Sequence, residues 1–146
     1  MVNFIKDLKD YLKARLSEKG FDMQVRDYVP DGQPIDDSIS VSAVSLKTEK
    51  IYESFDGGTA DVTEVEFRTV TVAKDGEKTA EERNVEIVGA IRALFDFTAA
   101  ADWNASVVRT DMTDFESPHP ISDSDERYES MLKVQFTVLM PYAALK

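Results

Sequence analysis

Cysteine is absent from this 146-residue chain, and histidine occurs once. The lack of cysteine excludes disulfides, thiolate metal sites and a cysteine nucleophile, and it suggests synthesis inside a cell. The single histidine, His119, stands between two prolines in a predicted loop, a setting more typical of an incidental residue than of a catalytic base. No serine lies in a nucleophile-elbow pattern, and the six glycines form no phosphate-binding loop. The sequence therefore predicts a protein that is not an enzyme and holds no cofactor.

Long apolar runs are also missing, so neither a signal peptide nor a membrane span is expected. The hydrophobic fraction of 42% is ordinary for a globular protein. Residues 1–146 are accordingly expected to form one domain with a proper core.

Charge is unevenly distributed along the chain. The net charge is −11, which disfavours direct binding to DNA or to anionic lipid. Residues 1–20 nevertheless carry five basic side chains against three acidic ones. A basic first helix beside an acidic body would allow head-to-tail attraction between copies, with Lys6, Lys9 and Lys13 as candidate contacts. The alternative is a solvated helix face without a partner.

Two amphipathic helices are predicted. The first covers residues 3–19, with Asn3 as its N-cap and Gly20 as its stop signal. The second covers residues 79–97, where Thr79 and Glu82 form a capping box. Its predicted core stripe recurs at three- and four-residue steps and is widened by further apolar positions; it comprises Val85, Ile87, Val88, Ile91, Leu94, Phe95 and Phe97.

Alternating apolar and polar residues predict strands at 21–28, 38–44, 62–73, 105–112 and 129–140. Residues 113–128 are predicted to be a loop, since Pro118 and Pro120 interrupt them. Ile51, Tyr52 and Phe55 fit a short strand, an apolar flap or a contact surface. The order α-β-β-β-α-β-β predicts an α+β fold with a mostly antiparallel sheet and both helices on one face.

An acidic segment near the end of the chain contains Asp123, Asp125 and Glu126, followed by Arg127. Oxygen-rich clusters of this kind can hold calcium or magnesium. This one lacks the turn glycine and the closing glutamate of an EF-hand loop, so a solvated acidic loop is favoured over a metal site. The acidic composition is also compatible with a protein that mimics DNA. Such a role would require carboxylates spaced like phosphates, a property of the folded surface rather than of the sequence.

Four stretches together resemble the small tail-terminator and minor capsid proteins of long-tailed bacteriophages. They are the opening helix at 4–12, the proline-bounded loop at 29–34 before the serine-rich strand, the strand at 65–72 leading into the capped helix, and the segment 120–128 feeding a final strand that ends at Met140-Pro141-Tyr142. Members of this family often show a proline, an aspartate and an Arg-Tyr-like pair in the last stretch. The glycine expected near Ser124 or Glu126 is missing here.

The resemblance implies a structural virion protein, assembled in the host cytoplasm and placed at the head-proximal end of the tail. Such proteins form rings of six copies that stop polymerisation of the tail tube and join it to the head connector. The implied partners are therefore other copies of this chain, the tail tube protein, the head connector, and DNA that passes through the lumen without specific binding.

Two other functions fit the residues. The first is a monomeric acidic module that binds or inhibits a basic or nucleic-acid-binding partner. The second, less favoured, is a metal-dependent hydrolase built on the Asp123 cluster. The predicted interface residues of the ring are Lys6, Lys9, Lys13, Ile51, Tyr52, Phe55, Asp123, Asp125, Glu126 and Arg127.

Overall fold

The computed structural model describes residues 2–26, 37–50, 59–73, 79–95, 107–121 and 127–140. These residues form two helices and five strands in the predicted order, so the α+β class is confirmed. The elements are α1 (Val2–Glu18), β1 (Gln24–Arg26), β2 (Ser38–Lys50), β3 (Thr59–Val72), α2 (Ala80–Phe95), β4 (Val107–Pro120) and β5 (Arg127–Met140).

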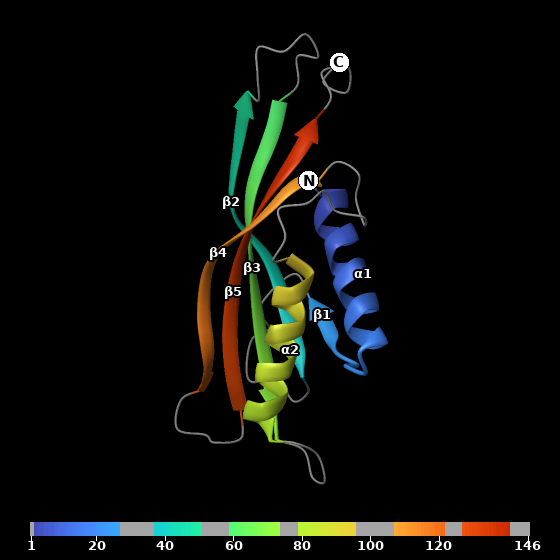
Figure 1. Ribbon diagram of the computed structural model, residues 1–146, viewed down its shortest axis with the longest axis vertical. Coiled ribbons are helices and arrows are strands. Elements are labelled where there is room, and N and C mark those ends of the chain that lie inside the picture. Colours follow the sequence, from blue (N-terminus) through green and yellow to red (C-terminus); the bar gives the residue numbers. More distant parts are fainter. Residues whose placement is uncertain are drawn as a thin grey trace.

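One sheet contains the five strands, in the order β1-β2-β3-β5-β4. Neighbouring strands are antiparallel except for β1 and β2, which run parallel. Both helices lie on the same side of the sheet, and the upper parts of β2, β3 and β5 extend past them (Figure 1). The fold is therefore a two-layer arrangement in which helices cover one face of the sheet, and none of the described elements covers the other, called here the uncovered face.

Helix α1 ends as its sequence predicts. Gly20 adopts a positive φ of 88°, a conformation that glycine reaches without a Cβ clash. The Phe21 N–H donates to the Leu16 carbonyl at 2.9 Å, and the Gly20 N–H donates to the Ser17 carbonyl at 3.0 Å. This pair of bonds is a Schellman motif, which satisfies carbonyls that the helix end leaves free.

Helix α2 begins at the predicted cap. The backbone N–H of Glu82 donates to Thr79 Oγ1 at 3.2 Å, and the Thr79 hydroxyl donates to the Glu82 carboxylate at 3.2 Å. The predicted core stripe was partly wrong, because Val85 is 52% exposed. Successive three-residue steps drift around a helix, whereas mixed three- and four-residue steps stay on one face. The face that is buried consists of Ala80, Arg83, Asn84, Ile87, Val88, Ile91 and Phe95.

Substitutions along α2 provide a direct test of this face. Ile91→Ala is expected to lower the free energy of unfolding by about 2–5 kcal/mol, because Ile91 is fully buried and leaves a cavity. Thr79→Ala removes the cap and is expected to cost about 0.5–2 kcal/mol. Val85→Ala, at an exposed position of the same helix, is the matched control and should change stability by less than about 0.5 kcal/mol. Urea unfolding ranks the three variants, and a mild Ile91→Ala would contradict the buried face.

The strands differ in length from the predictions. Residues 113–120 were predicted to be a loop but belong to β4, which continues through both prolines. Proline is tolerated there because β4 is the terminal strand of the sheet, where a missing N–H need not break a ladder bond. The strands predicted at 38–44 and 62–73 were also too short where they face each other, since β2 and β3 pair up to Lys50 and Thr59. Strand β1 is shorter than predicted, with three residues that pair with Ser38–Ser40.

Four phenylalanines join both helices to the sheet. The rings of Phe67 on β3 and Phe95 on α2 are stacked with centroids 5.2 Å apart. Phe136 on β5 meets Phe95 edge-on at 5.4 Å, and Phe4 on α1 meets Phe136 at the same distance. Edge-on and offset pairs are the favoured aromatic geometries. This cluster fixes where each helix sits on the sheet.

A buried ion pair ties α2 to the ends of two strands. Arg83 Nε donates to Asp37 Oδ2 at 3.0 Å, and the two side chains are 10% and 7% exposed. The Val72 N–H donates to Asp37 Oδ1 at 2.9 Å, and the Arg83 guanidinium donates to the Val72 carbonyl. Beside this pair, the Asn84 amide donates to the carbonyls of Thr69 and Tyr128. These bonds attach the first turn of α2 to β2, β3 and β5.

Candidate oligomer interface

The three lysines predicted as contacts lie on α1. Lys6 and Lys13 are exposed and Lys9 is half-buried, while the opposite face of the helix buries Phe4, Leu8, Leu12 and Leu16. Positions three, four and seven apart share a helix face, so the three lysines form one basic stripe.

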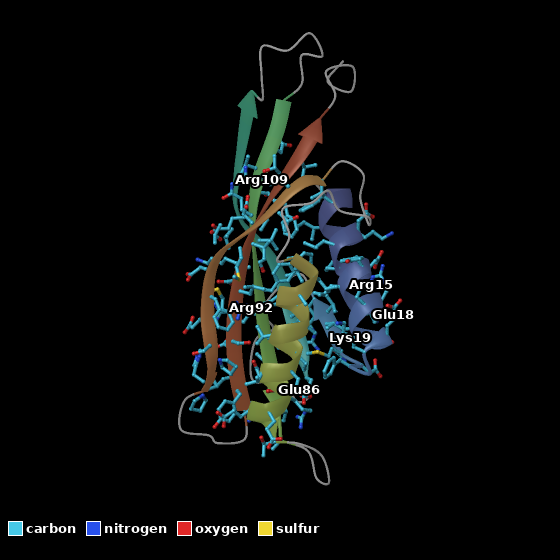
Figure 2. All side chains as sticks on the ribbon, in the orientation of Figure 1. Arg15, Glu18, Lys19, Glu86, Arg92 and Arg109 are labelled. Carbon is cyan, nitrogen blue, oxygen red and sulfur yellow. The ribbon has the colours of Figure 1, made fainter. Side chains whose placement is uncertain are left out.

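Charge on the outer side of α1 is partly neutralised within the helix. Arg15 Nη1 lies 3.1 Å from Glu18 Oε2, and the hydrogen bond to Glu18 raises the pKa of Arg15. Figure 2 shows Arg15 and Glu18 beside each other on the side of α1 away from the sheet. The Arg15 guanidinium also lies 5.4 Å from the centre of the Tyr11 ring, a cation–π geometry. Arg15 is therefore paired with an acid on its own helix, whereas Lys6 and Lys13 are the exposed members of the lysine stripe.

The acidic residues predicted for the same interface are described only in part. Asp123, Asp125 and Glu126 lie outside the described residues, as do Ile51, Tyr52 and Phe55. Arg127 is the first residue of β5 and is half-buried. Its carbonyl accepts a hydrogen bond from the Ile121 N–H at 3.0 Å, so the two described residues that flank 122–126 lie close together.

Strand β4 is itself acidic, although its residues 113–120 were predicted to be a loop. It carries Asp111, Asp114 and Glu116 against a single basic side chain, Arg109. Arg109 Nε is bonded to Asp111 Oδ2 at 2.7 Å, so the charge of Asp111 is already paired. Asp114 and Glu116 are exposed. Because residues 113–120 were predicted to be a loop, the sequence did not place Asp114 and Glu116 on a strand.

The topology places the basic and acidic elements at opposite edges of the molecule. Helix α1 contacts β1 and β2, whereas α2 contacts β3, β5 and β4. In the lower half of Figure 1, β4 forms one side of the molecule while β1 and α1 form the other. A basic surface and an acidic surface on opposite sides would be complementary in a head-to-tail interface, which joins two different surfaces of identical copies.

The uncovered face of the sheet carries a network of charges rather than an apolar patch. Arg68 Nη1 lies 2.8 Å from Glu129 Oε1, and Arg68 Nη2 lies 3.5 Å from Glu66 Oε2. Burial lowers the pKa of Arg68, but Glu129 and then Glu66 raise it by more, so the net pKa is raised. His119 also approaches Glu129, at 3.8 Å. Because these charges are largely paired with one another, this face offers less unpaired charge than the two edges.

No group of three or more metal-ligating side chains occurs within the residues that the structure describes. The Asp123 cluster lies outside the described residues, so the prediction that it binds no metal is not tested by the structure. Within the described ranges, no helix is long and apolar enough to cross a membrane. Neither the protein-family models nor the curated proteins with which the chain was compared match it.

Proposed function

We propose that this protein is a structural component of a phage tail, a terminator that forms a ring on the tail tube and joins it to the head connector. The observation that carries the proposal is the separation of charge across the fold. The basic helix α1 lies at the β1–β2 edge, and the acidic strand β4 lies at the opposite edge. Copies arranged head to tail would bring these edges together, and such contacts close into a ring when the rotation between copies allows.

The net charge of −11 per copy fits passage of DNA through the ring. A lumen of negative potential repels phosphates and keeps the nucleic acid from adhering. The order of elements also keeps two features on which the resemblance rests, an opening helix that leads into a strand and a strand followed by the capped helix. The ring proposal thus draws on charge, topology and resemblance together.

The proposal is tested in the phage that encodes the chain. Deleting its gene is expected to give tails of abnormal length and heads without tails, and supplying the wild-type protein should restore normal particles. Mass spectrometry of purified virions should find the chain in amounts consistent with a small ring. If the protein is absent from virions and remains with a soluble basic partner, the acidic binding module is the correct function.

A further inference from the structure

Two backbone edges of the sheet stand level with each other on opposite sides of the molecule. Strand β4 is the terminal strand at one side. At the other side, β1 pairs with β2 only over Ser38–Ser40, so within the described residues no strand pairs with the outer edge of β2 over residues 41–50. The register across the sheet aligns Ala43 with Val65, Val65 with Val134, and Val134 with Met112. The open stretch of β2 therefore lies level with the first half of β4.

The prolines of β4 lie where they would not interfere with pairing. His119, between Pro118 and Pro120, is level with Ser38, because both are connected through Val70 and Glu129. That is the part of β2 that β1 already covers. Residues 107–115 of β4 contain no proline and lie level with residues 41–48 of β2, the part that β1 leaves open within the described residues. In these level stretches, the backbone N–H groups of β2 and of β4 are therefore all present and can take part in strand pairing.

The directions of the two strands also suit an assembly by rotation. Three successive antiparallel pairings separate β2 from β4, so these two strands run in opposite directions. If copies are related by rotation about an axis along the strands, β4 of one copy meets β2 of the next in antiparallel orientation. Antiparallel strands need no crossover connection to pair.

Exposed apolar side chains mark both edges. Of the described residues, only three large apolar side chains are exposed, and two of them are Val44 on β2 (47%) and Met112 on β4 (38%). Each lies beside a register shift, between Ala43 and Ser45 and between Met112 and Asp114. Such bulges increase the local twist of a sheet, which suits the curvature of a small ring. Pairing the edges would bring both side chains into the interface.

We propose that residues 41–48 of β2 in one copy pair with residues 107–115 of β4 in the next copy, so that the sheets join edge to edge around the ring. This inference rests on the proposed function for its partner, a second copy of the chain. Backbone pairing at an exposed edge is a recurrent mode of protein association, and it satisfies donors and acceptors that an edge leaves free. The charges of α1 and β4 would then select the head-to-tail arrangement.

Engineered cysteines test the pairing cleanly, because the chain has none of its own. Met112→Cys protein is mixed with Val44→Cys protein in one experiment and with Ala43→Cys protein in another. Both β2 positions are used because a shift of one residue in the pairing register changes the face that a side chain occupies. Facing residues of an antiparallel pair have Cα separations compatible with a disulfide. Disulfide dimers are expected to form in at least one of these mixtures. Their rate of formation should exceed that in a control mixture of Met112→Cys with Val85→Cys by at least about tenfold, because docking raises the effective thiol concentration. Val85 is the matched control, exposed on α2 and away from both edges.

The experiment is run on purified protein and on tails assembled from the variants, with circular dichroism to confirm folding. Met112→Cys protein that cross-links to itself as fast as any mixture would show β4 meeting β4, which overturns the inference. Tails that contain the protein but give no cross-link from Met112→Cys to either β2 position overturn the edge pairing and leave the ring function standing. Absence of the protein from tails overturns the ring function, and cross-linking in solution would then still support the edge pairing.

Discussion

Replacing Arg83 with alanine is expected to lower the free energy of unfolding by about 3–5 kcal/mol, because Asp37 would remain as a buried charge without its partner. The Asp37 carboxylate is 7% exposed and faces the guanidinium through two hydrogen bonds, of 3.0 and 3.3 Å. The carbonyl of Val72 would lose its guanidinium donor as well. Urea unfolding followed by circular dichroism measures the loss.

Two control variants separate burial of the charge from loss of the side chain. Arg92→Ala removes an exposed arginine from the same helix and should cost no more than about 1 kcal/mol, including its cation–π contact with Phe115. The double variant Asp37→Leu with Arg83→Met leaves no unpaired charge, so it should be less destabilised than Arg83→Ala. The backbone groups of Val72 would still lose their partners, at about 1–3 kcal/mol. An Arg83→Ala protein as stable as Arg92→Ala would show that the pair contributes little to the fold.

The buried pair also shows where the sequence stops predicting the fold. Alternation places Val65, Phe67, Thr69 and Thr71 of β3 on one face of a strand, and in the structure all four are buried. This much is readable from the sequence, because side chains alternate between the two faces of any strand. Arg83 and Asn84 occupy the buried face of α2, but a charged side chain there is predictable only once its partner is known. That partner, Asp37, lies 46 residues earlier in the chain. Its position beside α2 follows from the tertiary arrangement rather than from any local pattern.

The candidate interface was predictable to a similar extent. The composition of residues 1–20 identified the basic stripe of α1 without a structure. Its position relative to the acidic strand was not predictable, because β5 is inserted between β3 and β4 in the sheet. That insertion makes β4 the terminal strand and moves its carboxylates to the edge opposite α1. Pro118 and Pro120 concealed the strand itself, since proline is predictive of a loop except at an edge.

Reversing the charge of Lys6 and Lys13 together is expected to prevent most incorporation of the protein into tails while leaving its fold intact. Both lysines are exposed on α1, so the double change to glutamate should alter the free energy of unfolding by less than about 1 kcal/mol. Lys9, the third lysine of the stripe, is half-buried and is left unchanged to protect the packing of the helix. In the proposed ring, the two glutamates would face the acidic edge of the neighbouring copy and repel it. Electron microscopy of tails and heads measures the defect as abnormal tail length and unjoined heads.

Two further variants separate the position of these charges from their number. Arg92→Glu with Lys133→Glu changes the net charge equally but beside β4, since Arg92 lies over Phe115 and Lys133 is the register partner of Asp114. These changes add negative charge to the acidic side of the proposed interface, so they should leave the particles normal once unfolding experiments confirm that the variant folds. Adding Asp123→Lys and Asp125→Lys to the Lys6 and Lys13 reversal restores opposite charges across every head-to-tail contact, since each interface contains one basic and one acidic surface. Assembly should recover, and at low ionic strength more fully than at high, because salt screens exposed pairs. Normal particles from the original reversal would remove α1 from the interface. Failure of the charge swap alone would instead assign the partner of the lysine stripe to other acids, with Asp114 and Glu116 on β4 the next to test.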